Sequence, residues 1–256
     1  MKNLFFESTT TLQFDSPVVD HHFLLRCLPA SFAGQRIVSA TLQLSPAVPY
    51  TLSCDGFGNL NETGCIKFPH TEFIYKVSGL AQINEEERQR ERLHPIFTHP
   101  SHYTTVSPEM NAFLAGLALQ GGALEQAVQL ADAVYHAIAY QSGSTCTATT
   151  AAQAFAGGQG VCQDFSHIFI ALARKAGIPA RYANGLPLGE GQSHAWCEVY
   201  ADGMWQGIDP TRNRLIGEDY VRFCIGRDFG DCALERGVLF GSANQTQNTI
   251  TQVIEQ

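Results

Sequence analysis

Apolar and polar residues alternate along much of the first 80 positions, the pattern of strands that are buried on one face. In the segment IVSATLQL, apolar side chains recur at every second position from Val38 to Leu44, so this set is expected to face the core. DGFGN at residues 55–59 provides a turn, and the alternation resumes at residues 73–77. We therefore expect an N-terminal β-sandwich-like module over residues 1–85.

The period becomes helical after a break in the pattern. Charged residues at 84–92 and the widely spaced prolines that follow do not suit a regular element, which places the boundary between about 80 and 105. Three helices are then predicted. The first begins at Ser107, an N-cap followed by proline; the second carries an apolar stripe from Leu124 to Ile138; and the third ends at Gly157-Gly158.

A fourth helix opens at QGVC, residues 159–162, and closes at GIP, residues 177–179. Strand-like segments follow at 180–186, 194–200 and 204–209. Helices followed by an antiparallel sheet indicate the α+β class. We assign residues 86–240 to this core and residues 241–256 to a C-terminal tail that contains a strand.

Composition and charge exclude several classes of protein. The chain has 256 residues, 45% of them hydrophobic and 16% charged, which is typical of a globular protein. The formal net charge is −8 and basic residues are not clustered, so we expect no nucleic-acid partner and no anionic membrane partner. No apolar run reaches the roughly 18 residues of a membrane span, and the first residues are too short of apolar side chains for an export signal. We expect a cytoplasmic protein.

Eight cysteines in such a chain are interpreted as reduced thiols. Their spacing fits no zinc site, because Cys54 and Cys65 are eleven positions apart and Cys224 and Cys232 are eight apart. No acidic loop has the spacing of a calcium-binding EF-hand. We therefore expect neither a metal nor a cofactor.

Cys162 differs from the other cysteines because it stands where a glycine-rich segment becomes a helix. At that place the sulfur faces unpaired N–H groups and the positive end of the helix dipole, which favours the thiolate. Gly160 would let a substrate carbonyl approach the backbone, and Asp164 is expected to point away from the sulfur. The alternative for any one cysteine is a buried packing residue, which is the interpretation given to the other seven.

A predicted hairpin supplies a base and an acid. Asp202-Gly203 favours a two-residue turn, so residues whose numbers sum to 405 face each other. His194 and Asp209 then lie diagonally on one face, close enough for their side chains to touch. Taken singly, His194 is an ordinary strand histidine and Asp209 an ordinary strand end. Together with Cys162 they match the order and placement of a catalytic triad.

The same residues resemble the transglutaminase-like superfamily. GVCQDFSHIFIALARKAGIPARY, SHAWCEVY and WQGIDPTRN resemble its three blocks, which implies Cys162 as nucleophile, His194 as base and Asp209 as orienting acid. The segment with DGFGN resembles the β module that precedes this domain in bacterial members, and residues 226–241 resemble the tail that follows it. The resemblance implies a papain-like or transglutaminase-like core of helices packed on an antiparallel sheet.

The sequence departs from the family in its tail, where CALE at 232–235 replaces a valine and prolines and Phe229 replaces a frequent tyrosine. Neither change touches the triad residues. The amide N–H of Cys162 is expected to be one donor to the oxyanion, and Tyr140 is a candidate for the second. The alternative for Tyr140 is a core tyrosine at a helix end.

We expect a thiol-dependent amide hydrolase or acyltransferase that forms a thioester on peptide or glutamine-type amides, with hydrolysis as the preferred outcome and a cysteine protease as the favoured type. Its partner would be a peptide or protein substrate, and the oligomeric state stays open. The rival is a non-catalytic binding or scaffolding protein with a vestigial triad. A serine esterase is disfavoured because the chain has no GxSxG.

Overall fold

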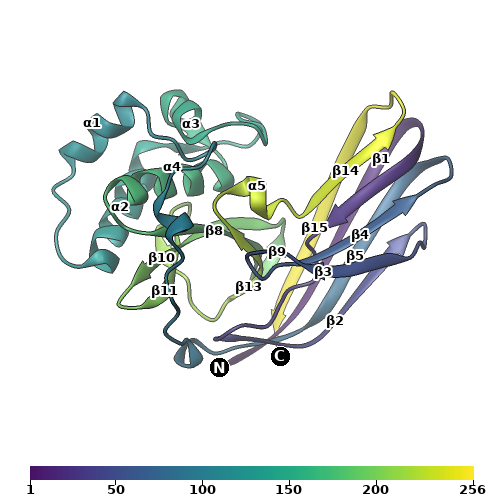
Figure 1. Cartoon of the computed structure of the whole chain (residues 1–256), viewed down its shortest axis with the longest axis horizontal. Coiled ribbons are helices and arrows are strands. Elements are labelled where there is room, and N and C mark those ends of the chain that lie inside the picture. Colours follow the sequence, from purple (N-terminus) through teal and green to yellow (C-terminus); the bar gives the residue numbers. More distant parts are fainter.

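The computed structural model describes residues 1–256, which form two parts lying side by side (Figure 1). One part is a large, curled antiparallel sheet, and the other packs helices against a second antiparallel sheet. The α+β class expected from the sequence is therefore confirmed.

The large sheet has eight strands built around the long strand β1 (Lys2–Leu25). Along the first half of β1 the strand order of the sheet is β2-β5-β1-β15-β9. The second half of β1 pairs with β4 and β14. The register shifts between Gln13 and Val18, where β1 changes partners. The remaining strands are β2 (Gln35–Ser45), β3 (Tyr50–Cys54), β4 (Leu60–Ile66), β5 (His70–Ile83), β9 (Gly189–Gly191), β14 (Glu235–Phe240) and β15 (Gln245–Glu255).

The predicted strand at β2 is present, but its buried set is only partly correct. A bulge between Ile37 and Ser39 changes the phase of the pleat against β5. As a result Leu42 and Leu44 are half-buried against the sheet core, whereas Val38 is 48% exposed. A perfect alternation in the sequence cannot reveal a bulge, because the extra residue is visible only in the pairing.

The C-terminal strands belong to the large sheet and lie beside its first strand. β15 pairs with β1 from Phe14↔Gln245 to Leu4↔Glu255, and the two chain ends lie close together (Figure 1). β14 pairs with the far end of β1. The large sheet thus combines residues from both ends of the chain.

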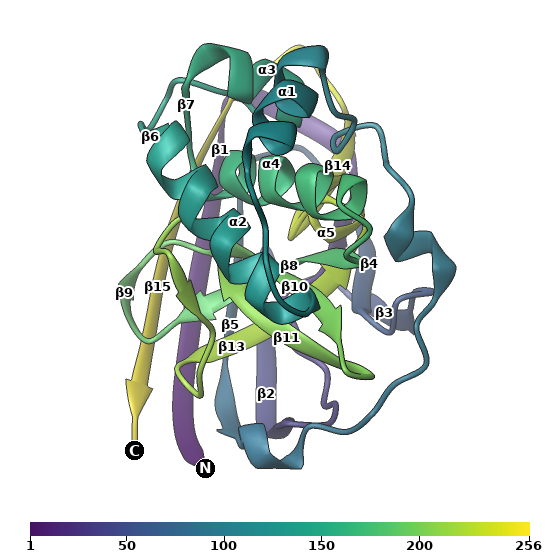
Figure 2. The same cartoon turned by 90° about the vertical axis from the view of Figure 1, so that its left-hand side faces the viewer.

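The helical part surrounds α4 (Cys162–Lys175), whose residues from Asp164 to Arg174 are all buried. Figure 2 shows α4 lying across the smaller sheet with α1, α2 and α3 around it. That sheet has the order β12-β11-β10-β8-β13. Its strands are β8 (Ala180–Pro187), β10 (His194–Ala201), β11 (Met204–Asp209), β12 (Arg214–Leu215) and β13 (Tyr220–Gly226). The other elements of this part are 3-10 helices at Glu85–Glu87 and Pro95–Thr98, α1 (Pro108–Gly116), α2 (Ala123–Ala137), α3 (Ala151–Gly157), α5 (Phe229–Cys232) and the short strands β6 (Ala139–Tyr140) and β7 (Gln159–Gly160).

Local capping explains where the helices begin and end. The Ser107 hydroxyl accepts a hydrogen bond from the amide of Met110, as expected of an N-cap. Gly158 ends α3 with φ of +66°, a left-handed conformation that glycine adopts without strain. None of the helices combines the length and the apolar character that crossing a bilayer requires.

Candidate active site

Cys162 is the first residue of α4 and is half-buried. The Asp164 carboxylate accepts hydrogen bonds from the Val161 amide at 2.8 Å and from the Thr145 hydroxyl at 2.7 Å. Asp164 therefore caps its own helix and fixes the preceding loop. The amide of Cys162 lies at the helix position where an N–H has no intrahelical acceptor, so it is free to bind an oxyanion.

The packing of Asp164 gives a steric reason for glycine at residue 160. Gly160 is buried, and a Cβ at this position would come within 2.6 Å of the Asp164 Cβ and 2.8 Å of its Oδ2. The absent side chain thus makes room for the capping carboxylate.

The hairpin forms with the expected register. Asp202 and Gly203 have φ of 52° and 83°, as a type I′ turn requires, and the pairs run from Ala201↔Met204 to Cys197↔Ile208. This register brings His194 beside Asp209, and Nε2 of the imidazole lies 2.7 Å from Oδ2 of the carboxylate. The other ring nitrogen, Nδ1, is left free for a further partner.

Asp209 is completely buried, and four neighbours saturate its carboxylate. Oδ2 accepts from His194 and from the Tyr220 hydroxyl at 2.9 Å, whereas Oδ1 accepts from the amides of Thr211 at 2.9 Å and Arg212 at 3.2 Å. Burial would raise the pKa of Asp209, but the bonds from His194 and Tyr220 and the Arg212 charge outweigh it and lower that pKa. The acid is therefore ionised at neutral pH.

Tyr220 is a part of the site that the sequence reasoning missed. It is buried at the start of β13, its ring packs edge-on against Trp196 at 5.2 Å, and its hydroxyl also accepts from Arg212 and Arg214 at 3.1 Å each. Burial and the Asp209 charge raise the pKa of Tyr220 to about 12, so the hydroxyl stays protonated and can donate. No motif around residue 220 indicates this role, because it depends on the pairing of β13 with β8.

His194 is 9% exposed and has a shifted pKa. Burial opposes protonation of the ring, but the hydrogen bond with Asp209 and the neighbouring Cys162 thiol outweigh burial and raise the pKa of His194 to about 9. The environment thus favours an imidazolium next to the thiol, which is the charge state of an activated cysteine–histidine pair.

Cys162 and His194 line one cavity of about 390 Å³, which we call the catalytic cavity. Tyr140 and Arg212 lie in its wall, as do residues of β9 and the loop that follows. Tyr140 is 59% exposed, so the interpretation as a core tyrosine is wrong, and its ring remains a candidate neighbour of the reacting carbonyl.

The eight cysteines are all free, but they are not alike. Buried packing positions are occupied by Cys27, Cys197, Cys224 and Cys232. The packing interpretation is wrong for Cys54 and Cys146, which are exposed. No group of three or more His, Cys, Asp or Glu side chains is placed to hold a metal ion.

Comparison with known proteins matches both parts of the chain. Residues 6–82 match the family model of the bacterial transglutaminase-like N-terminal region, and residues 113–210, which contain Cys162, His194 and Asp209, match that of the transglutaminase-like superfamily.

Individual relatives cover nearly the whole chain. An uncharacterised protein of Mycobacterium leprae is 24% identical over 268 residues, which cover 96% of each chain. One of Mycobacterium tuberculosis is 26% identical over 262 residues, or 88% of this chain and 82% of the relative. A solved structure from Cytophaga hutchinsonii, described as a candidate cysteine protease, has a TM-score of 0.82 at 23% identity and covers 99% of this chain and 90% of that one. This last likeness shows that the two proteins share a fold.

Proposed function

Because the chain belongs to the transglutaminase-like superfamily and carries the bacterial N-terminal region of that family, we propose that it is a cysteine hydrolase acting on peptide or glutamine-type amides. Cys162 is the proposed nucleophile, His194 the base and Asp209 the acid that orients the histidine. The proposal rests mainly on the buried 2.7 Å hydrogen bond between His194 and Asp209, together with the position of His194 in the wall of the same cavity as Cys162.

The proposed reaction begins when the Cys162 thiolate attacks the carbonyl carbon of the amide. The negative charge that develops on the carbonyl oxygen is stabilised by the amide N–H of Cys162, with Tyr140 as the candidate second donor. His194 passes its Nδ1 proton to the nitrogen of the leaving amine, and the C–N bond breaks to leave a thioester on Cys162. His194 then takes a proton from water, whose oxygen attacks the thioester and releases the acid and the thiol.

An amine in place of water would give acyl transfer through the same thioester. The three side chains would have the same roles with either acceptor, and hydrolysis is preferred because water is always present. The cysteine protease assignment and the cytoplasmic location remain predictions.

A substrate screen tests this function. Peptides and glutamine donors are incubated with wild type, Cys162→Ala and Cys146→Ala, with and without a primary amine, and products are identified by mass. Cys146 is the matched control because it is an exposed thiol in the neighbouring loop. We expect amide cleavage by wild type and Cys146→Ala and none by Cys162→Ala. Equal turnover by all three proteins would contradict the assignment of the nucleophile.

Thiol labelling separates an enzyme from a scaffold with an inert triad. With limiting iodoacetamide at pH 6 to 7, we expect Cys162 to react faster than the exposed Cys54 and Cys146, since it adjoins the imidazolium of His194. The scaffold alternative gains support if Cys162 reacts no faster than these two.

A further inference from the structure

A second and larger cavity, of about 730 Å³, lies between the inner face of the large sheet and the helical part. One wall comes from β1, β5, β14 and β15, and the other from the loops near residues 103 and 147 and from α5. We call it the inter-sheet cavity. Figure 1 shows where β14 and β15 face α5 and the loop before α3.

The two cavities adjoin each other. Ser193, which directly precedes His194, lines both of them. The opposite wall is also connected, because the Gln163 side chain, next to Cys162, donates to the carbonyl of Thr147, which lines the inter-sheet cavity. A chain that crosses the catalytic cavity can therefore extend into the inter-sheet cavity.

Glu235 is the one carboxylate among the residues that line the inter-sheet cavity. It is half-buried, burial raises its pKa, and no basic neighbour acts on it. Glu198, a more deeply buried carboxylate, is by contrast paired with Arg181 and Arg222. A desolvated carboxylate without a cation is unfavourable unless a ligand brings one.

The nearby basic groups do not neutralise Glu235. Arg236 also lines the cavity, but successive residues of a strand point to opposite faces, and its guanidinium donates to the carbonyl of Gly230. His21 lies on the inner face, and burial together with His70 lowers the pKa of His21 to about 4, so this ring is neutral at pH 7.

Other groups of the wall suit a cationic N–H donor. Tyr75, Tyr103 and Phe229 provide aromatic surface, on which ammonium and guanidinium groups pack favourably. Asn184 lines the same cavity, is 6% exposed, and its Oδ1 has no hydrogen-bond donor. Two acceptors without donors beside aromatic rings form a site for a group that carries several N–H bonds and a positive charge.

We infer that the inter-sheet cavity binds a lysine or arginine side chain of the peptide whose amide reacts at Cys162, with Glu235 as the charged partner. This inference rests on the proposed function for the position of the reacting amide. The net charge of −8 also favours the approach of a basic peptide.

Cleavage profiling tests the inference. A peptide library prepared by cleavage after glutamate, which retains internal lysine and arginine, is incubated with wild type, Glu235→Gln, Glu235→Lys and Glu72→Gln. Glu72 is an exposed carboxylate of the same sheet and controls for the change in net charge. We expect basic residues to be enriched within about four positions of the cleaved bond for wild type and Glu72→Gln. The enrichment should fall about tenfold in Glu235→Gln, the size expected for one charged contact, and reverse towards acidic residues in Glu235→Lys.

A binding arm makes the result independent of catalysis. The same library is passed over immobilised Cys162→Ala and Cys162→Ala/Glu235→Gln, and retained peptides are sequenced by mass spectrometry. We expect the first protein to retain basic peptides and the second to lose them.

The outcomes separate the two proposals. Retention of basic peptides without any Cys162-dependent cleavage would contradict the proposed function and support the inter-sheet site. Cys162-dependent cleavage without a basic preference, or a preference that Glu235→Gln leaves unchanged, would overturn the inter-sheet site alone.

Discussion

The charge state of His194 depends mainly on one contact. Its bond with Asp209 is the strongest of the influences that raise the pKa of the ring to about 9, against the effect of burial. The imidazolium that protonates a leaving amine is therefore present below about pH 9 and is lost as pH rises through that value.

Asp209→Asn removes this contact. We expect kcat/KM to fall by about 10² to 10⁴-fold, the range for loss of an oriented acid–base group. The alkaline limb of the pH profile should move from about pH 9 towards the ordinary histidine value of about 6.5, because a neutral amide no longer stabilises the imidazolium. Steady-state kinetics across pH 5 to 10 measures both effects, and an unmoved limb would show that Asp209 does not set the pKa of His194.

Tyr220→Phe should move the alkaline limb of the pH profile in the opposite direction, to higher pH. The Tyr220 hydroxyl draws electron density from Oδ2 of Asp209, so its loss strengthens the pull of the carboxylate on His194 and raises the pKa of the ring. We expect kcat/KM to fall about three- to tenfold through looser orientation, with about 1 kcal/mol lost from the free energy of unfolding. Tyr135→Phe, on the exposed face of α2, is the control. A lower kcat/KM with an unchanged alkaline limb would show that Tyr220 contributes by packing and does not influence the pKa of His194.

The sequence could place His194 beside Asp209 because a two-residue turn fixes the register of its hairpin. It could not place Tyr220, which reaches Asp209 only after β13 crosses to pair with β8. Local turn chemistry is encoded over a few residues, whereas such a contact depends on how the whole sheet assembles.

At the scale of elements, the start of α4 depends on a glycine that holds no unusual backbone angle. Gly160→Ala would force its Cβ against Asp164 and break the cap that also fixes Thr145. We expect a loss of about 1 to 3 kcal/mol in the free energy of unfolding, as for loss of a cap with overpacking. Cys162 should also react more slowly with iodoacetamide.

Gly157→Ala is the matched control for that variant, because a Cβ at residue 157 meets nothing within 4 Å. Chemical denaturation of the two proteins measures the difference. Equal stability would contradict the steric role of residue 160.

Helix ends were predictable where a cap marks them, as at Ser107 and Gly158. The β2 bulge was not, since an unbroken alternation from Val38 to Leu44 gives no sign of an extra residue. Capping depends on side chains that are near in sequence, whereas a bulge depends on the partner strand.

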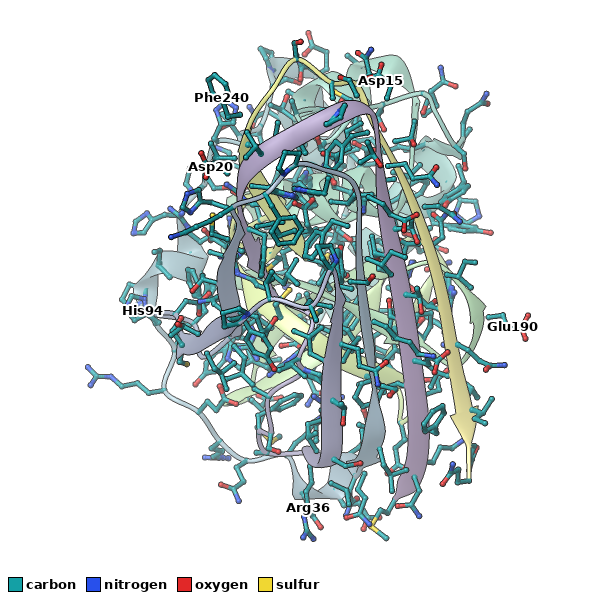
Figure 3. All side chains as sticks on the ribbon, turned by 90° about the vertical axis from the view of Figure 1, so that its right-hand side faces the viewer. Asp15, Asp20, Arg36, His94, Glu190 and Phe240 are labelled. Carbon is teal, nitrogen blue, oxygen red and sulfur yellow. The ribbon has the colours of Figure 1, made fainter.

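At the scale of the whole molecule, β15 links the large sheet to the segment that leads into His194. It pairs with β1 along one edge and with β9 along the other. Figure 3 shows Glu190, in β9, projecting at this edge of the sheet. The sequence predicted a strand in the tail, but not its partners, because antiparallel pairing between chain ends leaves no local signal.

Val253→Asp tests how far the fold depends on this strand. Val253 is 1% exposed in the sheet core, so burying a carboxylate there should cost about 3 kcal/mol or more of the free energy of unfolding. Ile254→Asp, on the opposite face at 45% exposure, should change that free energy by less than about 0.5 kcal/mol. Thermal melts of the two variants provide the comparison, and similar melting temperatures would show that β15 contributes little to stability.

The pairing of β1 with β15 also has a consequence during synthesis. Residues 4–14 of β1 pair with residues 245–255, which are made much later, so this edge of β1 stays unpaired until β15 has been synthesised. Thr251, which contributes to the wall of the catalytic cavity, arrives with that last strand. The nascent chain can therefore form its hairpin and helices before β15 is made, but the wall of the catalytic cavity is complete only after β15 has paired with β1.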